Sequence, residues 1–125
     1  TLDTHFDDYL TTAEGKSLPV PHCIKGTVGH KLYGGLADAL KGKLCFEKNT
    51  FPSLEMAKYL EGKDFDTIEL CGLVSNICVL SNAVMAKSAC PNSEIIVDSS
   101  LTAAADEEIH QKSLDVMKGL FIKVL

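Results

Sequence analysis

The sequence predicts an α/β fold of three layers, in which a mainly parallel sheet lies between layers of helices. Apolar runs of strand length alternate along the chain with segments of helical pattern, starting and ending in strands. The apolar runs are continuous, which is typical of parallel strands that are buried on both faces. The length and composition fit one compact domain, because 46% of the 125 residues are hydrophobic.

The first half of the chain opens with Thr1-Leu2, interpreted as the end of a strand because polar residues follow at once. Residues 3 to 31 have no clear hydrophobic period, and a long irregular segment in a compact domain usually has a function. A helix is expected at Leu32–Leu40, and a buried strand at Leu44–Glu47. The next helix is Ser53–Leu60, whose serine can cap its N-terminus.

The second half repeats the alternation of strand and helix. Its elements are, in order, the strand Thr67–Leu73, the helix Asn76–Ala89, the strand Glu94–Val97, the helix Asp106–Lys118 and the strand Phe121–Leu125. Ser75 or Asn76 can cap the first of these two helices. The last helix carries Ile109, Leu114 and Met117 on one side, which we expect to face the core.

Charge and cysteine content exclude several classes of protein. The net charge is −5 and the 12 basic residues are scattered, which argues against a nucleic-acid partner. No apolar run approaches the ~18 residues of a membrane span, so no membrane partner is expected. The five cysteines form no CxxC pair, which favours reduced thiols in a cytoplasmic protein over disulfides or a thiolate zinc site.

Cys78 is the cysteine with the strongest case for chemistry. A buried strand ends near Leu73, so Cys78 falls in the first turn of the following helix. Backbone N–H groups and the positive end of the helix dipole favour a thiolate there, and the same N–H groups can hold an oxyanion. The alternative is a cysteine packed between helix and sheet.

Lys48 follows the predicted strand Leu44–Glu47. Neighbouring parallel strands end at the same edge of a sheet, so Lys48 and Cys78 are expected to face one crevice. An ammonium group beside a thiol lowers its pKa. The alternative is an ordinary solvated lysine.

The polar segment near the N-terminus contains a candidate metal site. Asp3 and His5 point the same way in an extended chain, and Glu14 and His22 follow in the same segment. Imidazole and carboxylate groups together suit Zn²⁺, Mn²⁺ or Fe²⁺. The alternative is a polar loop held by hydrogen bonds. Four further groups are expected to be ordinary surface residues: Asp7, Asp8, His30 and His110.

The motif Gly-Leu-Val-Ser-Asn-Ile-Cys-Val at residues 72 to 79 resembles the nucleophile signature of the isochorismatase-like cysteine hydrolases, within them the nicotinamidase/pyrazinamidase branch. The resemblance extends from Asp3 to Leu125 and implies a Rossmann-like three-layer fold. It implies Cys78 as nucleophile and Lys48 as catalytic lysine. It also implies a cis peptide bond between Leu73 and Val74, and an oxyanion hole made by the N–H groups of Val74 and Cys78.

The resemblance also implies a divalent metal, with zinc as the first choice and manganese or iron as alternatives. Its ligands would be Asp3, His5 and His22, the last within a Pro-His-Cys motif. Tyr9 stands at one place where that branch often has a histidine, which makes Glu14 the candidate for a fourth ligand.

The implied activity is release of ammonia from a small carboxamide, with nicotinamide first, in the context of NAD salvage. Phe51 either packs against the substrate ring or belongs to the core. We expect a cytoplasmic homo-oligomer. Two alternatives remain: a metal-free relative that acts on another amide or on isochorismate, and a non-enzymatic binding domain on the same fold.

One catalytic group of the resembling family has no counterpart here. The general-base aspartate of that family follows a first strand, which would precede Thr1. We therefore expect residues 1–125 to be an N-terminally incomplete hydrolase domain that is neither stably folded nor active alone.

Overall fold

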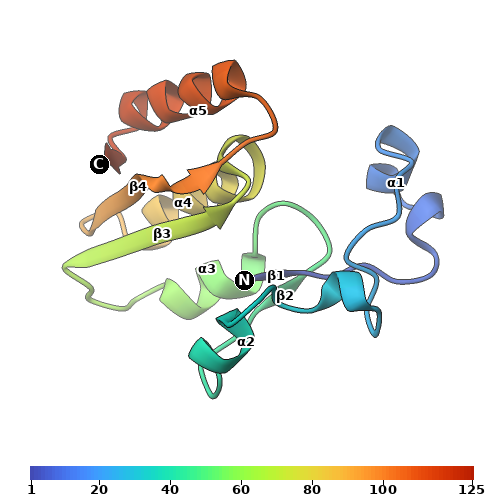
Figure 1. Cartoon of the computed structure of the whole chain (residues 1–125). Coiled ribbons are helices and arrows are strands. Elements are labelled where there is room, and N and C mark those ends of the chain that lie inside the picture. The colour runs from blue at the N-terminus through green and yellow to red at the C-terminus, as the bar shows by residue number, and fades with distance from the viewer. The chain divides into compact units, whose positions relative to one another are not determined.

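The computed structural model describes residues 1–125, and its contacts group the chain into two compact units, Thr1–Thr50 (unit 1) and Phe51–Leu125 (unit 2). Figure 1 shows the elements of both units. Every strand pair is parallel and helices lie between the paired strands along the chain, which confirms the predicted α/β class with a mainly parallel sheet. No helix combines the length and the apolar character that crossing a membrane requires.

Unit 1 is built on one short strand pair. β1 (Leu2–Asp3) lies parallel to β2 (Glu47–Lys48), with Leu2 opposite Glu47 and Asp3 opposite Lys48. The chain between them forms short helices and 3₁₀ turns. These are the 3₁₀ turn Tyr9–Thr11, α1 (Ala13–Ser17), the 3₁₀ turn Val28–His30 and α2 (Leu36–Ala39).

Two predicted elements of unit 1 differ from the structure. The helix expected at Leu32–Leu40 is reduced to α2, because Gly34 has a φ of +58° and so cannot be part of a right-handed helix. The strand expected at Leu44–Glu47 begins only at Glu47, since its pairing partner β1 is two residues long. The side chain of Leu44 is 66% exposed, so its apolar character does not mark a buried strand.

Unit 2 contains a three-stranded sheet in the order β3-β4-β5. Its strands are β3 (Thr67–Leu73), β4 (Glu94–Ala103) and β5 (Lys123–Val124). Its helices are α3 (Leu54–Leu60), α4 (Leu80–Ala89) and α5 (Glu107–Gly119), and α4 packs against both of the others. β3 has the predicted bounds, whereas β4 extends six residues beyond Val97 because its pairing with β3 resumes at Gly72↔Thr102 after a register shift.

The three-stranded sheet is buried mainly on one face. The connections through α4 and α5 step across the sheet in the same direction, and right-handed crossovers of this kind place both helices on one face. Ile68 and Leu70 of β3 pack against the core, whereas the alternate residues Glu69 and Cys71 are exposed and Leu73 is 70% exposed. The expectation that the strands are buried on both faces is therefore wrong for β3.

The core of unit 2 joins α4 and α5 to the sheet. Its buried residues include Val79, Ala83, Ala86, Ile95, Val97, Leu114, Met117 and Ile122. On α5 the buried face is formed by His110, Ser113, Leu114 and Met117. Ile109 is 46% exposed, so the expectation that it faces the core is wrong, and so is the expectation of a surface position for His110.

Candidate active site

The candidate site residues of unit 1 are brought together first by the strand pair. The register of β1 and β2 sets Asp3 directly beside Lys48. The Lys48 ammonium donates hydrogen bonds to Asp3 Oδ1 at 3.1 Å and to the Thr50 carbonyl at 3.0 Å. Lys48 is only 8% exposed, so the alternative of a solvated surface lysine is wrong. A buried ammonium with two acceptors is held in one orientation.

A second pairing brings His22 next to His5. The His5 N–H donates to the Cys23 carbonyl at 3.0 Å, and the Lys25 N–H donates to the His5 carbonyl at 2.8 Å. Cys23, directly after His22, has a φ of +48°, a left-handed conformation that turns the chain there. Nδ1 of His22 lies 2.8 Å from the Val20 carbonyl, which can only accept. Neutral His22 therefore carries its proton on Nδ1 and has a lone pair on Nε2.

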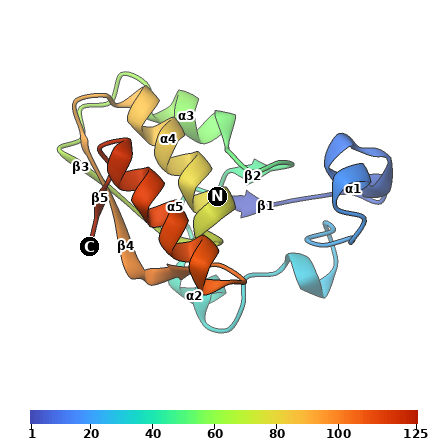
Figure 2. The same ribbon diagram turned by 90° about the horizontal axis from the view of Figure 1, so that it is seen from above.

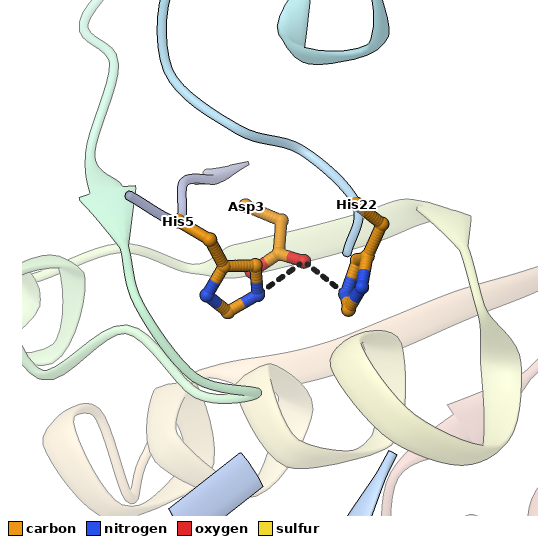
Figure 3. A group of neighbouring side chains, drawn as sticks. All are labelled: Asp3, His5 and His22. Carbon is orange, nitrogen blue, oxygen red and sulfur yellow. Dashed lines mark ion pairs between the residues drawn. The ribbon is translucent and has the colours of Figure 1, made fainter. Parts of the chain in front are cut away.

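The four predicted metal ligands converge, and Figure 3 shows the Asp3 carboxylate between the two imidazole rings. His5 Nε2 lies 3.5 Å from Asp3 Oδ2 and 3.4 Å from Glu14 Oε1. His22 Nε2 lies 3.5 Å and 3.9 Å from the same two oxygens. Asp3, His5 and His22 each offer one ligand atom, and these atoms lie within 4.8 Å of one another.

These spacings suit a shared ion better than hydrogen bonds among the ligands. The four distances exceed the 2.7–3.2 Å of good N–H···O hydrogen bonds. Two atoms that each lie about 2.0–2.2 Å from one ion are about 3–4 Å apart at tetrahedral or octahedral angles. His5 Nε2 and Glu14 Oε2 are also buried without a hydrogen-bond partner, which is costly unless another group satisfies them. The donor set therefore fits a divalent metal.

Glu14 owes its position to the start of α1. The Thr12 hydroxyl accepts a hydrogen bond from the Gly15 N–H at 3.0 Å and so caps the helix. A Cβ at Gly15 would lie 2.0 Å from the Tyr9 carbonyl oxygen, so only glycine allows α1 to pack this close to the preceding turn. The cap and the close packing place Glu14 in the first turn of α1, within reach of both histidines.

Tyr9 forms a wall of the cluster rather than a ligand. Its side chain is buried, and its ring centroid lies 4.6 Å from that of His5 and 5.1 Å from that of His22. Its hydroxyl donates to the Leu18 carbonyl at 2.9 Å. Burial, and then the negative charges of Glu14 and Asp3, raise the pKa of the Tyr9 hydroxyl above its usual value, so it stays a neutral donor.

A cavity of about 350 Å³ lies beside this cluster within unit 1. Its lining includes His5, Phe6, Tyr9, Glu14, Asn49 and Thr50. Two of the predicted ligands, His5 and Glu14, thus border a space large enough for a small ligand. The neighbouring residues Asp7 and Asp8 are exposed, as expected. His30 is half-buried and its Nε2 lies 2.9 Å from Thr4 Oγ1, so the expectation of an ordinary surface histidine is wrong.

In unit 2, Cys78 lies in a π-helical turn, Ser75–Val79, that leads directly into α4. The peptide bond between Leu73 and Val74, just before this turn, is cis. The N–H groups of Ile77 and Val79 both donate to the Val74 carbonyl, at 3.2 and 3.1 Å. Cys78 is half-buried and at the start of the continuous helical segment, as the sequence predicts, although in π rather than α geometry.

The predicted cap of this helix is wrong. The residue before the turn is Val74, and no side chain caps the turn. Ser75 is instead fully buried, with its hydroxyl 2.9 Å from Nδ1 of His110 on α5. Because this hydrogen bond satisfies both side chains, a histidine can occupy the buried face of α5.

Two further residues complete the description of unit 2. Phe51 is 39% exposed, so the alternative of a core phenylalanine is wrong. Asn82, which was not singled out in the sequence, is buried and donates a hydrogen bond to the Cys78 carbonyl at 2.7 Å. The only signal for it in the sequence is its place four residues after Cys78, where one helical turn brings a side chain back to that carbonyl.

Comparisons with known proteins place these features in context. The family description "isochorismatase domain" matches residues 1–125. The nicotinamidase/pyrazinamidase PncA from Bacillus subtilis is 26% identical, with a TM-score of 0.81 over 98% of this chain and 71% of that one. The pyrazinamidase/nicotinamidase from Streptococcus mutans is 28% identical, with a TM-score of 0.82 over 98% of this chain and 72% of that one.

A third structure shows the same fold at lower identity. The pyrazinamidase of Pyrococcus horikoshii, solved in complex with zinc, is 20% identical, with a TM-score of 0.78 over 99% of this chain and 72% of that one. No curated protein matches the chain.

Proposed function

Because the chain belongs to the isochorismatase family of hydrolases and to its nicotinamidase branch, we propose that it hydrolyses the C–N bond of a small carboxamide. Nicotinamide is the first candidate substrate, which would give nicotinate and ammonia. The observation that carries this choice is the cluster of Asp3, His5, Glu14 and His22 at ligand spacings. In a metal-free relative, His5 Nε2 and Glu14 Oε2 would stay buried without a partner, which is costly, whereas a bound metal would satisfy this pair of side chains.

We assign the nucleophile to Cys78. Its sulfur would attack the amide carbonyl carbon, and the N–H groups of Val74 and Cys78 would stabilise the negative charge on the oxygen. The thiol proton passes to the amide nitrogen, so that ammonia leaves as the thioester forms. Water then cleaves the thioester, which releases the carboxylic acid and restores the thiol.

Lys48 and Phe51 have supporting roles in the proposal. Lys48, whose ammonium is buried, would be the catalytic lysine. The exposed ring of Phe51 would contact the ring of the substrate. Asp3, His5, Glu14 and His22 would hold the metal, for which zinc is the first choice with these nitrogen and oxygen ligands. A bound metal supplies Lewis-acid chemistry toward a ring nitrogen or a water molecule.

The test is amide hydrolysis by the full-length protein and two cysteine variants. Cys78→Ala should reduce ammonia release from nicotinamide by at least about 10³-fold, because no other group forms the thioester. Cys71→Ala is the matched control, since Cys71 is an exposed thiol on the preceding strand. Substantial turnover by Cys78→Ala would exclude the mechanism. A wild-type protein whose Cys78 is inert toward alkylating reagents would favour the non-enzymatic alternative.

A further inference from the structure

Asn82 connects the turn that contains Cys78 to the segment that precedes α3. It lies on α4 and is 4% exposed. Its side-chain amide donates to the Cys78 carbonyl at 2.7 Å and to the Phe51 carbonyl at 3.2 Å. Its side-chain oxygen accepts the Ser53 N–H at 2.9 Å. One buried side chain therefore contacts three backbone groups from two segments of unit 2.

The orientation of this amide is fixed by its partners. The Ser53 N–H can only donate and the two carbonyls can only accept, so exchanging Oδ1 and Nδ2 would break all three hydrogen bonds. Both hydrogens of Nδ2 are used, one toward each segment. No other common side chain of similar size offers two donors and an acceptor in this geometry.

The neighbourhood explains why a side chain is needed here. α3 and α4 lie side by side in unit 2 (Figure 2). Ser53 is the N-cap of α3, where backbone groups lack helical partners. Phe51 is followed by Pro52, which has no N–H to donate. The Asn82 side chain supplies hydrogen-bond partners for the Phe51 carbonyl and the Ser53 N–H, and it connects both to the backbone of Cys78, the residue proposed as nucleophile.

We propose that Asn82 is a positioning residue that holds the backbone of Cys78 in register with Phe51. This inference rests on the proposed function, in which Cys78 attacks a carboxamide whose ring contacts Phe51. Asn82 would set the distance between the Phe51 ring, which contacts the substrate, and the Cys78 sulfur, which attacks it. Its loss should therefore affect carboxamides with an aromatic ring more than small aliphatic amides, which make no ring contact.

Two variants distinguish the hydrogen bond from Asn82 to Cys78 from those to Phe51 and Ser53. Asn82→Ala removes all three hydrogen bonds. Asn82→Thr keeps a hydroxyl that can donate to the carbonyl four residues earlier, that of Cys78, but is too short to reach Phe51 or Ser53. Ser53→Ala is the matched control, because it removes the hydroxyl that caps α3 and leaves the N–H that Asn82 accepts.

The experiment measures Cys78 alkylation by iodoacetamide, and kcat and KM for nicotinamide and for propionamide, in the full-length protein. Asn82→Thr should alkylate at a rate close to that of the wild type but lose about 10- to 100-fold in kcat/KM for nicotinamide, as expected when reacting groups shift by about 1 Å. Its loss with propionamide should be much smaller. In Asn82→Ala the alkylation of Cys78 should be slower as well. Ser53→Ala should keep the wild-type alkylation rate and the wild-type kcat/KM for nicotinamide.

Several results would overturn the proposal. One is equal losses with both amides in Asn82→Thr, and another is a loss in Ser53→Ala as large as that in Asn82→Thr, since either indicates a purely structural role. Unchanged alkylation in Asn82→Ala would also exclude it. If the wild type does not hydrolyse nicotinamide, the proposed function fails by itself, and the alkylation rates still decide whether Asn82 positions Cys78.

Discussion

At the scale of single residues, the cluster in unit 1 depends on which atom each side chain turns inward. Tyr9 points its hydroxyl to the Leu18 carbonyl and its ring to the two histidines, so it contributes an apolar wall. His22 has its Nδ1 proton directed to the Val20 carbonyl, which leaves Nε2 for the cluster. Such a hydrogen bond to the other ring nitrogen is the usual way in which proteins orient a metal-binding histidine.

His5 should be the most sensitive of the proposed ligands, because it is buried and its Nε2 has no hydrogen-bond partner. We expect the full-length protein to contain about one zinc, manganese or iron ion per chain, and His5→Ala to lose it. Elemental analysis after dialysis measures this directly. His30→Ala is the control, because the His30 side chain forms a hydrogen bond with the Thr4 hydroxyl and is not one of the four proposed ligands. Metal content that is unchanged in both His5→Ala and His22→Ala would show that the site is elsewhere.

At the scale of elements, α5 shows how a polar residue can occupy a helical core face. The residues of its buried face, His110, Ser113, Leu114 and Met117, follow the i, i+3, i+4, i+7 pattern of a helix. The hydroxyl of Ser113 donates to the His110 carbonyl at 2.7 Å, and His110 is paired with Ser75. The two polar side chains thus enter the core with partners, which keeps the cost of burying them low.

Leu114→Ala tests the apolar part of this face. Leu114 is 3% exposed, so its truncation should lower the free energy of unfolding by about 2–5 kcal/mol through lost burial and a residual cavity. Val116→Ala on the same helix is the control, since Val116 is 51% exposed and should change stability by less than about 1 kcal/mol. Urea denaturation of the full-length protein measures both. Equal effects of the two substitutions would contradict the assigned face.

The elements that could be predicted from sequence are those whose local pattern agrees with their packing. β3 has the predicted bounds, and Ser53 caps α3 as expected, with its hydroxyl accepting the Met56 N–H. The predictions fail where a residue far away in the sequence determines which side chain is buried. Ile109 fits the apolar pattern of α5, but the hydrogen bond available from Ser75 allows His110 to take the buried position. A pairing 35 residues apart has no signal in a local window.

The same distinction applies to the candidate site. The residues of the metal cluster and Cys78 could be proposed because their types and spacing resemble a known motif. Asn82 could not, because an asparagine in a helix gives no local sign of the Phe51 carbonyl that it will meet. The π geometry of the Ser75–Val79 turn was also outside what the sequence predicts, since helical periodicity does not separate π from α over five residues.

At the scale of the whole molecule, a metal that binds only the folded state should stabilise it. Zinc at about 100 times its dissociation constant should add about 2.7 kcal/mol to the free energy of unfolding. We expect the Tm of the full-length protein to fall by several degrees after chelation and to recover with zinc but not with magnesium, which prefers oxygen ligands. Differential scanning calorimetry measures the shift. A similar recovery in His5→Ala would mean that the stabilising zinc binds outside the cluster.

The close contact at Gly15 also limits which sequences this segment can adopt. A side chain there would meet the carbonyl oxygen and carbon of Tyr9 and the Cα of Leu10, all of them backbone atoms that cannot rotate aside. Even a single methyl group would have to push apart the turn that carries Tyr9 and the helix that carries Glu14. A position with no charge and no reactive atom is thus as restricted as a metal ligand. In a library that varies every residue of this segment, active clones should retain glycine here as strictly as they retain His5.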